Sequence, residues 1–174
     1  MDALMEEVGA DVAKYIFLTR KPNSHLDFDL DLAKEQSSDN PVYYVKYAHA
    51  RICSLLKKAE EAGMKTREPS AKYLNLLHET AEWNLVRELI RLPHVIISAA
   101  RSREPHRLTG YVYEVAELYH KFYHHCKVLK IMDEQPDVAQ GRLQLSLATR
   151  HVLRVVLDLL GVDAPEVMEE KVSS

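Results

Sequence analysis

The sequence predicts an all-α protein folded as an antiparallel helical bundle. Apolar residues recur at spacings of three and four along most of the chain, the period at which an α-helix presents one face to a core. Glycine accounts for only 5 of the 174 residues, which leaves little room for glycine-rich loops that cradle phosphates. The composition, 47% hydrophobic and 28% charged, is typical of a globular domain. Because the sequence has no internal repeat, a single bundle is the simplest architecture.

The first helix is predicted between Asp2 and Arg20. Its apolar residues recur at helical spacing and form one stripe: Leu4, Met5, Val8, Val12, Ile16 and Phe17. Pro22 should follow the end of this helix, because proline lacks the N–H that a helix interior needs. The next segment, 25–32, alternates like a strand for a few residues, and we interpret it as an irregular link into a short helix.

Asn40 and Pro41 predict the start of a long helix. The Asn40 side chain can accept hydrogen bonds from the first helical amides, and Pro41 at the first helical position loses nothing by lacking its own N–H. Gly63 should end the helix, since glycine readily adopts the left-handed conformation found after a last turn. The helix has one apolar stripe: Val42, Val45, Ala48, Ile52, Leu55, Leu56 and Ala59.

Shorter helices are predicted over the middle of the chain. After a polar link over 64–69, the segments 70–78 and 79–92 give either one broken helix or two short ones, closed by Pro93. Another helix should cover 94–103.

The helix predicted from Pro105 to about Leu129 is the most aromatic segment. It should begin at Pro105 because a proline disfavours helical geometry at the residue before it, here Glu104. The aromatic residues are Tyr111, Tyr113, Tyr119, Phe122 and Tyr123.

The last long helix is predicted from Asp137 to Leu160. Asp137 with Gln140 three residues later resembles a capping box, and Gly161 should stop the helix. The tail beyond Gly161 is expected to fray.

Charge is distributed unevenly along the chain. Residues 1–40 carry a balance of −5, whereas residues 41–168 carry +3 and hold eight of the nine histidines. The larger part could therefore face a polyanion, although solvated helix faces would give the same composition.

Membrane and secretory signals are missing from the sequence. No apolar run approaches the ~20 residues needed to cross a bilayer, and the acidic N-terminal stretch does not resemble a secretory signal. The two cysteines, Cys53 and Cys126, are too few for a disulfide framework and have no CxxC spacing. We therefore expect reduced thiols in a cytoplasmic protein without membrane contact.

One group of residues suggests a metal site. Glu117, His120 and His124 share a helix face, with His125 beside them, and a Glu-x-x-His pair is half of a carboxylate-bridged di-metal site in a bundle. No second Glu-x-x-His exists among the sixteen glutamates, so we favour a partly exposed histidine-rich face and predict no metal. Cys53 and Cys126 lie in apolar stripes, which is typical of small buried residues and not of nucleophiles.

A second group suggests RNA binding. In a helix, Tyr44 and Tyr47 lie three residues apart and Arg51 four further on, so two phenol rings and a guanidinium share one ridge. Exposed aromatic rings beside a cation suit an unpaired base with its phosphate. The alternative is that these tyrosines only pack the bundle.

Six segments together resemble a known family. They run in unbroken order between about residues 4 and 168: 9–18, 24–33, 40–52, 104–108, 122–129 and 159–168. All are similar to the C-terminal third of bacterial arginyl-tRNA synthetases. The resemblance implies a DALR-type anticodon-binding domain over 40–174, preceded by the last helical part of a class I catalytic domain over 1–39.

The resemblance also implies partners and a site. The partners would be the anticodon loop of tRNA(Arg) and the enzyme's own catalytic domain, with the protein a monomer. The implied anticodon-binding residues are Ser38, Asp39, Asn40, Tyr44, Tyr47, Arg51, Tyr123, Lys127 and Met168. The last of these would pack on a base as an adaptable apolar side chain.

Two departures from the family limit what the resemblance implies. The family usually has Gln where this chain has Lys46, so an amide–base contact is not implied there, although a lysine could still reach phosphate. The class I signatures HIGH and KMSKS are absent, so we expect no catalytic residues, no cofactor in this chain and no arginyl-adenylate formation by it alone. ATP and Mg would belong to the parent enzyme. The alternative function is a stand-alone helical interaction or metal-binding module.

Overall fold

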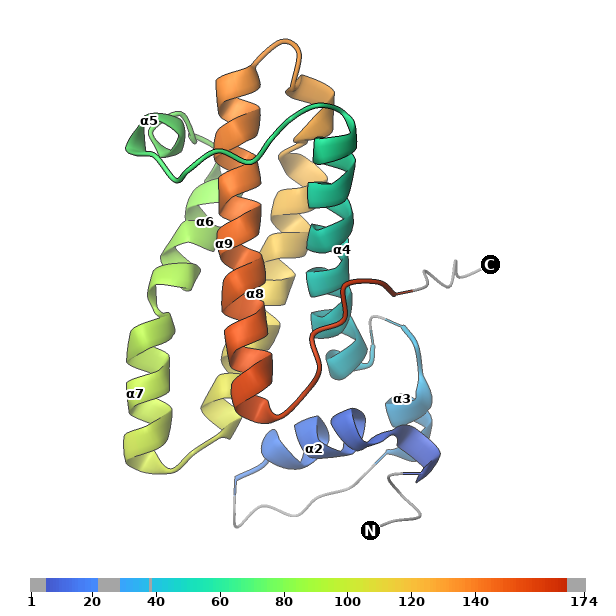
Figure 1. The fold of residues 1–174 in the computed structure, drawn as a ribbon. Helices are drawn as coiled ribbons and strands as arrows, with labels where there is room; N and C mark the ends of the chain where they lie inside the picture. The colour runs from blue at the N-terminus through green and yellow to red at the C-terminus, as the bar shows by residue number, and fades with distance from the viewer. Residues whose placement is uncertain (1–5, 22–28, 38, 169–174) are drawn as a thin grey trace.

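Four helices form the body of the protein. The structure, a computed structural model, describes residues 6–21, 29–37 and 39–168. The bundle helices are α4 (Pro41–Glu61), α6 (Thr80–Ile90), α8 (His106–His125) and α9 (Pro136–Leu160). They follow one another in alternate directions (Figure 1), and α8 and α9 each pack against the other three. The predicted all-α antiparallel bundle is confirmed, and within the described ranges no helix is long and apolar enough to cross a membrane.

The bundle core is built from the apolar stripes of these helices. Its largest fully buried side chains include two from α8 and several from the facing helices: Tyr119, Phe122, Ile52, Leu85, Leu143, Leu153 and Leu157. Burial of this apolar surface is the main stabilising contribution, and it fixes α4 against α8, where the candidate site lies.

The start of α4 is fixed as the sequence predicted. The Asn40 carboxamide oxygen accepts from the N–H groups of Val42 (3.0 Å) and Tyr43 (3.3 Å). Its NH₂ donates to the carbonyls of Ala33 (3.1 Å) and Glu35 (2.9 Å) at the end of α3 (Leu30–Lys34). Asn40 is therefore a cap that also holds the preceding turn. Residues 25–28 of the predicted link lie outside the described residues, and the short helix expected after the link, α3, begins within it at Leu30.

The helix α2 (Ala10–Leu18) packs only part of the predicted stripe against the bundle: Val12 is partly buried on the core. Ala13 and Tyr15 are its buried residues, and the Tyr15 hydroxyl donates to the Thr109 carbonyl (3.0 Å). Phe17, by contrast, is 42% exposed. Gly9, with φ of 86°, breaks the expected continuous helix. Two members of the predicted stripe lie outside the described residues: Leu4 and Met5.

The middle of the chain forms three helices, which fits the predicted alternative of two short helices followed by another. They are α5 (Ala71–Leu74), α6 and α7 (Leu92–Ser102). Pro93 lies in the first turn of α7, where the missing N–H costs nothing, so it opens that helix and does not close α6. Arg103 ends α7 with φ of 56°.

The helix α8 ends earlier than predicted, at His125, and a short 3₁₀ turn follows at Leu129–Ile131. The predicted capping box of α9 is also wrong. Pro136 is the first residue of α9, and the Asp137 carboxylate accepts from Lys72 Nζ (2.9 Å). Gln140 is buried, and its amide faces the backbone of the 65–67 loop.

The segment after α9 is packed and not frayed over residues 162–165, whereas Val167 further along is 81% exposed. Gly161 ends α9 with φ of 66°, as predicted. Beyond it Val162 is only 2% exposed, and the Asp163 N–H donates to the Asp11 carboxylate (3.1 Å). His49 of α4 donates through Nδ1 to the Pro165 carbonyl (2.8 Å), because a carbonyl can only accept. The tail is therefore held against both α2 and α4.

Candidate nucleic-acid interface

Side chains from α4 and α8 meet in what we call the aromatic cluster. Its members are Tyr43, Tyr44, Tyr47, Arg51, His120 and Tyr123. The α4 residues Tyr44, Tyr47 and Arg51 share a ridge, as their spacing predicted. In α8, His120 and Tyr123 are one turn apart and face that ridge. The bundle thus brings together two segments about seventy residues apart in sequence.

Arg51 is the centre of the aromatic cluster. Its Cζ lies 4.5 Å from the Tyr47 ring centroid and 4.8 Å from that of Tyr123, so the guanidinium interacts with a π face from each helix. Nη2 donates to the Tyr47 hydroxyl (2.8 Å), and Nη1 donates to His120 Nδ1 (3.0 Å). The cation is therefore part of the stack and bridges α4 to α8.

His120 is neutral in this arrangement. Since a guanidinium has only donors, His120 Nδ1 must accept, which places the ring proton on Nε2, 3.5 Å from the Tyr44 carbonyl oxygen. The residue is 7% exposed. Burial, followed by the charge of Arg51, lowers the pKa of His120 to about 4.

This lowered pKa predicts acid sensitivity of the fold. The unfolded chain binds a proton at His120 near its ordinary value of 6.5, whereas the folded chain does so only near 4. The unfolded state therefore gains protons first, and the free energy of unfolding should fall as pH drops from 6.5 to 4. Thermal melting across this range should show the fall, and His120→Asn should show a smaller one. An equal fall in both proteins would contradict the assignment.

The aromatic cluster lies between two hollows. Tyr43 stacks on Tyr47 with ring centroids 6.0 Å apart and also lines a cavity of about 320 Å³ together with Asn40, Lys46 and Met168. At the other end Tyr123 lines a cavity of about 250 Å³, whose wall includes two lysines: Lys127 and Lys130. The cluster therefore contributes one residue, Tyr43, to the cavity beside the turn before α4 and Met168, and another, Tyr123, to the cavity at the end of α8.

The exposure of the candidate residues differs in part from expectation. Tyr47 and Tyr123 are half-buried, not fully exposed, and Tyr123 also packs against the core. Asn40 is 2% exposed and its amide is used in capping, so its side chain holds the turn and is not placed for direct contact. Asp39 is exposed, and Ser38 lies outside the described residues.

Two lysines near the cluster are held in different ways. Lys127 is exposed, with Nζ 5.8 Å from the Tyr123 ring centroid. Lys46 pairs with the Asp11 carboxylate of α2 (2.5 Å), and both side chains are largely buried. The lysine at the unusual position therefore ties α2 to α4, whereas Lys127 remains the candidate for phosphate contact.

The metal alternative finds no support among the described residues. No group of three His, Cys, Asp or Glu side chains there could hold an ion. Glu117 pairs with Lys121 (2.7 Å), and His120 is engaged by Arg51. The sequence placed His120 on a partly exposed histidine-rich face, and this is wrong for His120, which is 7% exposed because it packs against Arg51 of another helix. Its place one turn before Tyr123 was the available signal.

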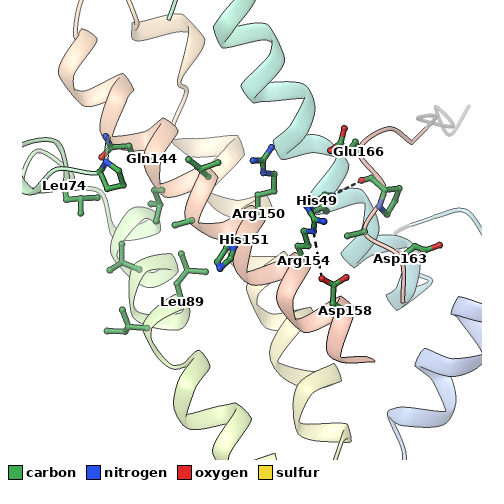
Figure 2. Close-up of a pocket in the computed structure, with 18 residues that line it drawn as sticks. His49, Leu74, Leu89, Gln144, Arg150, His151, Arg154, Asp158, Asp163 and Glu166 are labelled. Atoms are coloured by element: carbon green, nitrogen blue, oxygen red, sulfur yellow. Dashed lines mark hydrogen bonds and ion pairs between the residues drawn. The ribbon is translucent and has the colours of Figure 1, made fainter. Parts of the chain in front are cut away.

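A larger cavity of about 1020 Å³ lies between α6, α9 and the tail. Figure 2 shows Arg150, His151 and Arg154 of α9 along one wall and the acidic tail residues at one end. Arg154 is 4.0 Å from Asp158. No residue of the aromatic cluster lines this cavity, and its opposite charges largely balance. It forms only through packing of helices and tail, so the sequence did not predict it.

Comparison with known proteins identifies the family. Residues 45–168 match the DALR anticodon binding domain. The chain belongs to this family. The DALR match includes Tyr47, Arg51, His120 and Tyr123 and begins just after Tyr44, so most of the aromatic cluster lies within it. The domain boundary predicted at residue 40 stays a prediction. The helix before that boundary, α2, packs on α4, α8 and α9.

Relatives of this DALR domain are parts of larger proteins. The arginine–tRNA ligase of Moorella thermoacetica is 49% identical over 168 residues, which are 97% of this chain and 30% of that protein. The arginyl-tRNA synthetase structures of Thermus thermophilus and Plasmodium falciparum superpose with TM-scores of 0.77 and 0.79 at 28% and 26% identity. The two superpositions cover 93% and 96% of this chain, but only 27% and 28% of the Thermus and Plasmodium chains. The chain thus spans about 30% of the length of its relatives.

Proposed function

We propose that the chain binds the anticodon loop of tRNA(Arg) and positions this tRNA for arginylation by a class I catalytic domain of a parent enzyme. The relatives named arginine–tRNA ligases support the substrate. The observation that carries the proposal is the aromatic cluster on a DALR domain, with a cation held among rings from two helices.

The aromatic cluster fits the chemistry of a single-stranded loop. Unpaired bases can stack on aromatic or guanidinium planes, and basic groups nearby neutralise phosphates. Tyr47 and Tyr123 supply half-exposed rings, and Lys127 supplies an exposed cation. The cavities on either side, one bordered by Met168 and the other by Lys127, are suited to bases splayed out of the loop.

We further propose that the protein acts as a monomer in the cytoplasm. Both thiols are free, with Cys126 buried and Cys53 half-buried, as expected in a reducing compartment. ATP and Mg would be used only by the catalytic domain of the parent enzyme. The chain would bind the tRNA and would not itself catalyse a step of the reaction.

The chain alone should show no aminoacylation and no ATP–pyrophosphate exchange. The motivating observation is that the sequence contains neither class I signature. Both activities can be measured on purified protein with tRNA(Arg), arginine and ATP. Arginylation above background, retained after repurification, would contradict this expectation.

Binding to the anticodon hairpin should be weak and salt-sensitive. The excess of +3 over residues 41–168 is small, so we expect contact with few phosphates. If three or four are neutralised, log affinity should fall with log salt at a slope of about −2 to −3, using ~0.7 per single-strand contact. Lys127→Gln should make this slope shallower. A slope near zero for the native chain would exclude phosphate contact as the source of affinity.

A further inference from the structure

We propose that His120 is the positioning residue of the RNA site: its neutral imidazole holds the Arg51 guanidinium between the Tyr47 and Tyr123 rings before RNA arrives. This inference rests on the proposed function and assigns a role to a residue that the resemblance did not single out.

The geometry gives Arg51 a defined orientation. The two rings at 4.5 and 4.8 Å attract the cation but leave the guanidinium able to rotate in its plane. Hydrogen bonds from Nη2 to Tyr47 Oη and from Nη1 to His120 Nδ1 remove that freedom. The second of these joins α4 to α8, so His120 fixes Arg51 relative to the opposite helix. A site ordered in advance loses less conformational entropy on binding.

A neutral acceptor suits this task better than a carboxylate would. A buried Asp or Glu would also accept from Arg51 but would cancel its charge, and the cluster would lose attraction for phosphate. The imidazole fixes the guanidinium while its full positive charge remains. An imidazolium could not do so, because it has no acceptor and would place two cations about 3 Å apart.

The surroundings of His120 favour the neutral ring. On α4 it faces Arg51, the Tyr44 ring at 4.6 Å and the Tyr47 ring at 5.9 Å. On its own helix it faces Tyr119 at 6.3 Å and the nearby His124. Among the described residues, the charged or titratable side chains that shift the pKa of this ring are Arg51 and His124, and neither is a carboxylate. Burial and Arg51 together hold the pKa of His120 far below its ordinary value.

Two His120 variants test the role. Both remove the titrating ring, but Asn places a carboxamide oxygen near the position of Nδ1, whereas Leu offers no acceptor. Binding of a fluorescent tRNA(Arg) anticodon hairpin at pH 7 should weaken about tenfold in His120→Leu, which is about 1.4 kcal/mol. His120→Asn should recover most of that loss. Equal affinity in the two variants would overturn the proposal, and melting curves measured in parallel give the folded fraction of each.

A spectroscopic measurement tests the positioning without RNA. In long-range ¹H–¹⁵N spectra of the full chain at pH 7, His120 should carry its proton on Nε2 with Nδ1 unprotonated. Arg51→Met should raise the pKa of His120, because the neighbouring charge is removed. A proton on Nδ1, or no pKa change in Arg51→Met, would overturn the positioning role. If these spectra agree with the proposal but the native chain fails to bind the hairpin, the proposed function is wrong while the contact between His120 and Arg51 stands.

Discussion

Replacing Tyr47 by Ala should weaken binding of a tRNA(Arg) anticodon hairpin by about 1–3 kcal/mol, the range usual for one base–aromatic stack. The substitution removes a half-exposed ring and also the π face and hydroxyl on which Arg51 rests. Tyr47 is half-buried and is not part of the packed core. We therefore expect a stability loss of only about 1 kcal/mol, or a melting shift of about 2–4 °C in a chain of this length.

Matched variants separate stacking from general disruption. Tyr47→Phe keeps the ring but removes the hydroxyl that accepts from Arg51, so it should lose only part of the affinity. Trp83→Ala removes an exposed aromatic residue of α6 outside the cluster and should leave RNA affinity unchanged. Tyr123→Ala should weaken both binding and stability, because this ring also packs on the core. Normal binding by folded Tyr47→Ala would show that Tyr47 only packs the bundle.

Replacing Arg142 by Met should destabilise the fold by about 3–5 kcal/mol, the usual result when one partner of a buried ion pair is removed. Glu82 is 1% exposed, and its carboxylate accepts from Arg142 Nε (2.6 Å) and from the Glu79 N–H (2.8 Å). Without Arg142 this charge would be buried and poorly compensated. Arg142 Nη1 also donates to the Lys127 carbonyl (3.0 Å), so the substitution should loosen the Lys127 end of the RNA site.

Thermal melting of three proteins checks the Arg142 prediction. The single variant should melt roughly ten degrees or more below the native chain. Adding Glu82→Leu should restore much of the stability, because an apolar pair can replace a buried ion pair at little cost. An unchanged melting temperature in Arg142→Met would show that water already solvates Glu82.

The parts of the fold that local chemistry determines were predictable. Asn40 with Pro41, and the glycines at 63 and 161, correctly marked helix ends, because capping and left-handed φ depend on adjacent residues. The ridge of Tyr44, Tyr47 and Arg51 was likewise predictable from helical spacing. The resemblance then extended the expected site to α8 and the tail.

The parts that depend on packing were not predictable. Gln140 resembled a capping residue but faces the 65–67 loop, and residues 162–165 pack because α2 and α4 offer partners distant in sequence. The same reason explains His120, whose partner Arg51 lies 69 residues away. The half-burial of Tyr123 also follows from the contact between helices and not from its own helix.

The most direct measurement is a titration of the chain with two labelled anticodon hairpins, one with the tRNA(Arg) loop and one with its central base changed. We expect saturable binding of the first and at least about tenfold weaker binding of the second, or about 1.4 kcal/mol. We also expect Tyr47→Ala to reduce this preference. Equal affinity for both hairpins, unaffected by Tyr47→Ala, would contradict recognition of the anticodon loop by the aromatic cluster.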